Sequence, residues 1–202
     1  MLGIFGDKDK KLIKAVGEKE WGKAIKLIKK GANINARQGK TEYWDSGGTV
    51  LHLILGPLLH ENSMKKPEYS ELINLILSKN PDLEIKNDRG QTVLLAALGG
   101  GDIYDTVHKL INMGANVNAT WIDEDEEEKD SHWQGATPLH MAAGLYWVET
   151  VQLLIEKGAD INVNKRNGDT PLQATIKQYE EEEGDDPDFE KVISILKSHG
   201  AK

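Results

Sequence analysis

The chain has 202 residues, with 25 Lys and Arg, 33 Asp and Glu, no cysteine and a formal net charge of −8. The lack of cysteine excludes disulfides, thiolate zinc sites and a cysteine nucleophile, and no apolar run approaches the length of a membrane span. Residues 1–40 hold eleven basic and four acidic residues, a net charge of +7, whereas the remainder holds fourteen and twenty-nine, a net charge of −15. This acidic body argues against nucleic acid as the main partner.

Residues 8–30 predict a first pair of helices. Apolar residues recur there at helical spacing, and lysines stand between them. This pattern is expected of a terminal element whose outer side faces water. A basic binding face is the alternative reading of the same lysines.

The clearest helical unit lies between residues 136 and 164. Thr137 can cap a helix, and Pro138 suits the first helical turn because its missing N–H would be unpaired there. A second, bulkier apolar helix follows, and Gly158 fits the left-handed position that ends it. The unit is therefore helix, turn, helix and glycine stop.

This unit recurs along the chain. Glycine stands two residues before threonine at Gly47/Thr49, Gly90/Thr92, Gly135/Thr137 and Gly168/Thr170. A Gly-Ala pair ends the second helix at Gly31, Gly114, Gly158 and Gly200. The threonines are 43, 45 and 33 residues apart. Self-similarity of this kind indicates a solenoid of stacked units.

The repeated residues resemble a known family. Thr137-Pro138-Leu139-His140 with Gly158-Ala159-Asp160-Ile161-Asn162, and Asn167-Gly168-Asp169-Thr170-Pro171-Leu172 after them, are similar to ankyrin repeats. The resemblance extends from about residue 8 to the end. Val50 and Val93 depart from it at the proline position, and Leu95 and Gln173 at the histidine position. It implies an all-α fold, an ankyrin-repeat solenoid of about five helix-turn-helix repeats with projecting hairpin-like loops.

The resemblance also implies the organisation of the chain. We expect one domain, 1–202, with an N-terminal capping repeat at 8–30, internal repeats at 48–79, 91–113 and 136–157, and a C-terminal capping repeat at 169–202. At the motif histidines, His52 and His140, the family implies a structural hydrogen bond that ties the start of a helix to neighbouring backbone.

Aromatic and acidic residues in the long loops and one turn are the predicted partner-binding residues. Tryptophan and tyrosine often anchor protein interfaces, and residues 123–130 place seven carboxylates between two tryptophans. The alternative for these two tryptophans is that they fold back and brace their own loop. The predicted binding residues are Tyr43, Trp44, Asp45, Trp121, Asp123, Glu124, Asp125, Glu126, Trp133, Tyr146 and Trp147.

No pattern in the sequence points to catalysis, a metal or a cofactor. The six histidines fall in different repeats and loops without metal-ligand spacing. The acidic run lacks the alternation and the glycine of a calcium loop. No serine stands in a Gly-x-Ser-x-Gly elbow.

These observations predict a non-enzymatic module that binds another protein through its concave face and its acidic, aromatic loops. We expect a partner with a basic surface, no nucleic acid, no membrane, a monomer when free and a cytoplasmic location, although a chain without cysteine is also compatible with export. Two alternatives stay open. One is a stoichiometric inhibitor or immunity-type protein that masks a basic surface, and the other is a self-assembling structural scaffold.

Overall fold

The protein is all-α in the part of the chain that the structure describes. A computed structural model describes residues 6–39, 46–56, 66–100, 103–122, 133–181 and 186–202. Within these ranges ten helices form five pairs. The strand-like pairing among the described residues is one isolated antiparallel bridge, between Arg37 and Thr49. The pairs are α1 (Asp7–Gly17) with α2 (Trp21–Lys29), α3 (Val50–Leu55) with α5 (Pro67–Leu77), α6 (Val93–Leu98) with α7 (Tyr104–Asn112), α8 (Pro138–Gly144) with α9 (Val148–Glu156), and α10 (Pro171–Glu181) with α11 (Asp188–Ser198).

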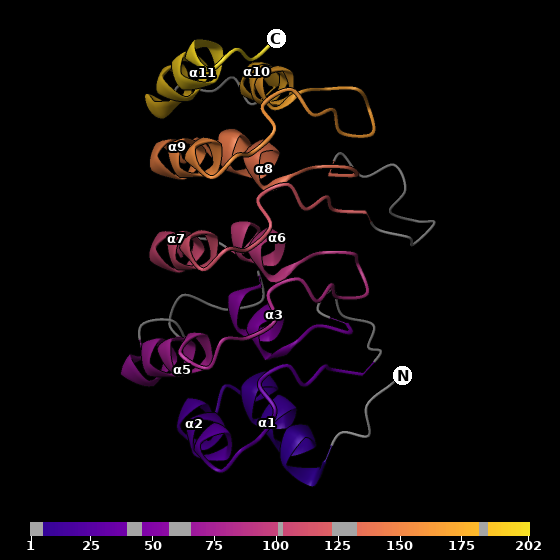
Figure 1. Cartoon of the computed structure of the whole chain (residues 1–202), viewed down its shortest axis with the longest axis vertical. Helices are drawn as coiled ribbons and strands as arrows, with labels where there is room; N and C mark the ends of the chain where they lie inside the picture. The colour runs from indigo at the N-terminus through magenta and orange to yellow at the C-terminus, as the bar shows by residue number, and fades with distance from the viewer. Residues whose placement is uncertain (1–5, 40–45, 57–65, 101–102, 123–132, 182–185) are drawn as a thin grey trace.

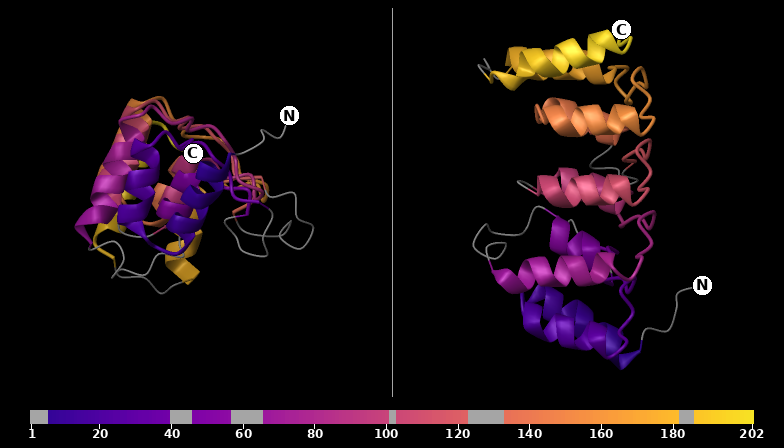
Figure 2. Two further views of the ribbon diagram at one scale, coloured as in Figure 1. Left: turned by 90° about the horizontal axis from the view of Figure 1, so that it is seen from below. Right: turned by 60° about the vertical axis from the view of Figure 1, so that its left-hand side comes forward.

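The five pairs stack into an elongated solenoid with two columns of helices (Figure 1). The first helices of the pairs, α1, α3, α6, α8 and α10, pack on one another in the inner column, next to the projecting loops. The second helices form the outer column, in which α2 packs on α5, and α9 packs on both α7 and α11. Viewed along the stack, the loops lie nearly over one another on one side of the helices (Figure 2). The expected repeat solenoid is therefore confirmed.

The hydrophobic core runs the whole length of the stack. Inner helices are enclosed by their own partner and by the inner helices of both neighbours, so α6, with the sequence VLLAAL, has all six residues buried. Outer helices bury one face only, as Val151 and Leu154 of α9 show. Helices this short are not stable by themselves in water. Fully burying one Leu, Ile or Val side chain stabilises the fold by about 1.5–3 kcal/mol, so the helices are stabilised mainly by packing on their neighbours.

The loops between the pairs form a second continuous layer. Within one loop, Trp121 N–H donates to the Ala136 carbonyl at 2.9 Å and closes a hairpin. Between loops, the Asp88 N–H donates to Ser46 O at 2.8 Å and the Arg166 N–H to Gln134 O at 2.9 Å. The loops therefore support one another, and this fixes their spacing along the stack.

Gly90 shows how closely these loops approach. Its φ of +72° lies in the left-handed region that side chains disfavour. A Cβ atom built on Gly90 would lie 2.0 Å from the carbonyl oxygen of Ile122, in the next loop. Only glycine fits at this contact.

The two motif histidines tie neighbouring repeats together. The ring of His52 accepts from Thr49 N–H at 3.1 Å, and its other nitrogen lies 3.0 Å from the carbonyl oxygen of Gln91 in the next loop. His140 makes the same contacts with Thr137 and with Asp169 O. The structural hydrogen bonds implied by the family resemblance are confirmed at both positions.

Candidate binding groove

Seven of the predicted binding residues lie outside the described residues, so their role stays a prediction. They are Tyr43, Trp44, Asp45, Asp123, Glu124, Asp125 and Glu126. The four others, Trp121, Trp133, Tyr146 and Trp147, are described.

Trp121 and Trp133 come together at the base of their loop. Their ring centroids are 6.1 Å apart, and the ring planes are inclined by only 13°. Both side chains are half-buried and pack against the core, and Gly135 N–H donates to Trp121 O at 2.7 Å in the same hairpin. This geometry supports the bracing alternative. The binding prediction for the two tryptophans stays open beside it.

Both tryptophans also line a pocket of about 400 Å³ in the concave side of the stack. Its floor comes from the inner helices, through Ala96 and Leu98 of α6 and Met141 of α8, and from the residues that directly follow them, Gly99 and Leu145. Its loop side is formed by Arg89 and Gln91 together with the two tryptophans. Leu145 is 40% exposed, so an apolar side chain is already available to solvent in the pocket. The pocket therefore joins loops and inner helices of the third and fourth helix pairs.

Trp147 takes a different position from the one expected of a surface anchor. It is 6% exposed, and its ring centroid lies 4.1 Å from that of Tyr104. It lines the same pocket as Trp121 and Trp133, so a partner would reach its edge through the pocket rather than on an open turn.

Tyr146 belongs to a separate aromatic cluster. Its ring packs edge-on against Tyr179 at 6.3 Å and against Phe189 at 5.9 Å, and the latter two rings stack at 3.7 Å. These contacts join the fourth helix pair to the fifth. Its predicted role in binding stays a prediction, and its visible role is packing.

A second concave pocket, of about 460 Å³, lies one pair further along and shares Trp133 with the first. It is more polar, since Lys165, Asp169, Lys177 and Glu181 are among its lining residues. Burial acts to raise the pKa of Asp169. The ion pair with Lys177, 2.5 Å between Nζ and Oδ1, together with the hydrogen bond from Asn167 and the charge of Lys165, outweighs burial and holds that pKa below its usual value. Burial lowers the pKa of Lys165. The groove thus changes from apolar to charged along the stack.

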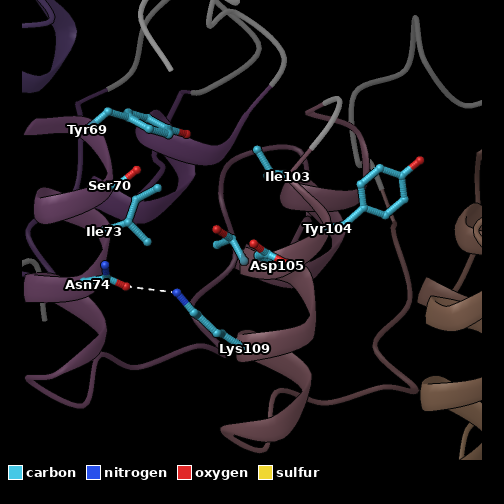
Figure 3. Close-up of a pocket in the computed structure, with 9 residues that line it drawn as sticks. Tyr69, Ser70, Ile73, Asn74, Ile103, Tyr104, Asp105 and Lys109 are labelled. Atoms are coloured by element: carbon cyan, nitrogen blue, oxygen red, sulfur yellow. Dashed lines mark hydrogen bonds between the residues drawn. The ribbon is translucent and has the colours of Figure 1, made fainter. Parts of the chain in front are cut away.

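A third hollow, of about 380 Å³, opens between the outer helices α5 and α7 (Figure 3). Tyr69 and Ile73 face Ile103 across it, and Lys109 Nζ donates to Asn74 Oδ1 at 3.0 Å. Its lining mixes apolar and polar side chains with one acidic residue, Asp105, and one basic residue, Lys109.

Sequence reasoning missed several residues of the apolar pocket, namely Arg89, Gln91, Met141 and Leu145. Gln91 and Met141 resemble ordinary motif and core positions, so only inter-repeat packing shows that they share one cavity with the tryptophans.

Among the residues that the structure describes, no three His, Asp or Glu side chains are grouped so that they could hold a metal ion. None of the described helices is both long and apolar enough to cross a membrane.

Comparison with known proteins agrees with this architecture. A family model described as ankyrin repeats (3 copies) matches residues 119–184, which contain the fourth helix pair and α10, the first helix of the fifth pair. The chain is an ankyrin-repeat protein. It is 30% identical over 130 residues to ankyrin repeat protein OPG189 of Variola virus, covering 64% of this chain and 21% of the relative.

Other similar proteins are larger and come from diverse organisms. The putative E3 ubiquitin-protein ligase XBAT34 of Arabidopsis thaliana is 32% identical over 117 residues, covering 58% of this chain and 26% of the ligase. Rabankyrin-5 of Mus musculus is 37% identical over 95 residues, covering 45% of this chain and 7% of the relative. This ankyrin-repeat chain thus spans about a quarter or less of the length of each relative. The likeness supports a repeat scaffold that generally serves protein–protein interaction.

Proposed function

We propose that this chain is a non-enzymatic ankyrin-repeat module that binds a partner protein through its concave groove and adjoining loops. The observation that carries the proposal is the apolar pocket of about 400 Å³ in which Trp121, Trp133 and Trp147 meet the inner helices. Large aromatic side chains in a concave, partly buried setting are typical anchors of protein interfaces. The proposal takes residues 1–202 as one domain with a cytoplasmic location.

The stacked loops make this surface suitable for tight binding. Backbone hydrogen bonds link neighbouring loops, and the near-parallel tryptophan rings lie at the base of the loop between α7 and α8. A surface that is already ordered loses less conformational entropy when a partner docks. Rigid loops over a helical floor therefore favour recognition of one shape.

Charge favours a partner with a basic surface. The seven carboxylates of residues 123–130 stand between the two groove tryptophans in the sequence, and residues 41–202 carry a net charge of −15. Such a field accelerates association with a cationic surface, and salt screens it over a Debye length of about 8 Å at physiological ionic strength. The inhibitor alternative is a special case, in which the masked basic surface is itself functional.

The scaffold alternative is distinguished by its dependence on salt. This alternative is based on the charge distribution, because the basic residues 1–40 of one copy could attract the acidic remainder of another. Self-association of this origin weakens as ionic strength rises. Sedimentation velocity at low and high salt separates a monomeric binding module from an electrostatic assembly.

Affinity capture from the native cell extract tests the proposal. Two groove variants are compared with the intact protein, Trp121→Ala with Trp133→Ala, and Leu145→Glu. The second changes the pocket without touching the hairpin. Met113→Ala, which alters an exposed apolar side chain (39% exposed) away from the pocket, is the matched control.

All four proteins are first shown to have the same circular dichroism and similar melting temperatures. A partner that is retained by the intact protein and the control, and lost by both groove variants, supports the groove as the binding surface. Retention of the same partner by all four proteins refutes it.

A further inference from the structure

The described lining of the groove pocket is apolar with one charged residue. Of the ten described residues that line the pocket, Arg89 alone carries a charge. The large apolar residues of the lining are Trp121, Trp133, Met141, Leu145 and Trp147. A volume of about 400 Å³ is within the range of sites that hold a small ligand or a large side chain.

The guanidinium of Arg89 is not used by the described structure. Arg37 and Asp88 nearby are engaged, since Arg37 donates to Gly47 O at 2.7 Å and Asp88 accepts from Ser46 Oγ at 2.7 Å. Arg89 is half-buried, and its side chain forms no hydrogen bond or ion pair within the described residues. Its backbone N–H is held by Asn87 Oδ1 at 3.1 Å, so the residue itself is positioned.

From this arrangement we infer that the pocket takes a bulky apolar side chain of the partner with a carboxylate beside it, and that the carboxylate pairs with Arg89. The inference rests on the proposed function and names the chemistry of its central contact. Guanidinium binds carboxylate with two parallel hydrogen bonds, and such charge-assisted pairs are stronger than neutral ones. The apolar side chain covers the tryptophan and leucine surface that is otherwise left to water.

A cationic side chain fits this pocket less well. Tryptophan faces attract cations, but a cation beside Arg89 is repelled at a distance of a few ångströms, where a partly buried charge is weakly screened. The partner's basic surface thus raises the rate of association, whereas its one acidic anchor determines the specificity of binding.

A series of three small probes with the same ring and different charge tests the inference. At about pH 6, N-acetyl-phenylalanine is an anion, N-acetyl-phenylalaninamide is neutral, and phenylalaninamide is a cation. Each is titrated into ¹⁵N-labelled protein while the indole N–H signals are followed by NMR. The signals of Trp121, Trp133 and Trp147 are assigned with single Trp→Phe variants. Trp21, which is buried in α2 and packs edge-on against Tyr69 of α5, is the internal reference. Ligands of this size bind with dissociation constants on the order of 1 mM.

The expected order of affinity is anion, neutral probe, cation, with the anion about fivefold tighter than the neutral probe. Arg89→Gln removes the preference for the anion, whereas Arg166→Gln, which changes an exposed loop arginine outside the pocket, keeps it. Tightest binding of the cation, an anion preference that survives in Arg89→Gln, or no shift of the three groove signals at millimolar probe would each overturn the inference. If that happens while both groove variants still lose the captured partner, the proposed function stands and only its anchor chemistry is wrong.

Discussion

Lowering the pH from about 7.5 to about 5 should destabilise this protein through His52 and His140. His52 is fully buried and His140 is 3% exposed. Burial lowers the pKa of each imidazole from 6.5 to about 4, against the opposing effect of a hydrogen bond to a backbone carbonyl. The unfolded chain therefore takes up protons at both histidines below about pH 6.5, while the folded chain does so only near pH 4.

The size of the effect follows from proton linkage. Because the folded pKa is the lower one, the stabilisation is fully present above pH 6.5 and is lost as the pH falls toward 4. Each histidine costs about 2 kcal/mol at pH 5, so the pair costs about 4 kcal/mol. For a domain of this size that corresponds to a melting temperature lower by roughly 10 °C.

The assay compares urea unfolding of the intact protein with that of His52→Leu combined with His140→Leu, at both pH values. Leucine is chosen because Leu95 occupies the same motif position in the third helix pair, where it is fully buried. The variant should be less stable at pH 7.5, by about 1–2 kcal/mol per site for the lost hydrogen bonds, and its stability should fall much less between pH 7.5 and pH 5. An equal fall in both proteins would refute the assignment of the pH dependence to these histidines.

Two matched pairs of substitutions test the packing of the repeats. Gly90→Ala should destabilise the protein by several kcal/mol more than Gly168→Ala. Both positions have a positive φ, but of the two only the Cβ at Gly90 would meet backbone, 2.0 Å from Ile122 O. Chemical denaturation measures the difference, and equal losses of stability would contradict the prediction. Thr92→Val should leave stability unchanged or raise it by about 1 kcal/mol, because the buried Thr92 hydroxyl has no hydrogen-bond partner among the described residues. Thr137→Val should lower stability by about 1–2 kcal/mol, because it removes a hydroxyl that lies 2.9 Å from His140 Nδ1. A larger loss for Thr92→Val than for Thr137→Val in calorimetry would show that this hydrogen-bond accounting is wrong.

The sequence by itself determined the fold class and most helix positions. Each repeat carries its own local signals, such as Thr137 before Pro138 at a helix start and Gly158 after a helix end, and these act over a few residues. The predicted pairs at 91–113 and 136–157 accordingly contain the observed helices α6 with α7 and α8 with α9. The motif histidines were also predictable, because their partners are fixed by the repeat itself.

The binding groove was decided only by tertiary structure. Trp121 and Trp133 were singled out from composition, yet their stacking, the burial of Trp147 and the participation of Arg89 and Leu145 were not visible in the sequence. The physical reason is that the pocket belongs to no single repeat. It forms where the loop of one repeat meets the inner helix of the next, at a spacing set by side-chain packing and by hydrogen bonds between loops, and local sequence signals do not encode that distance.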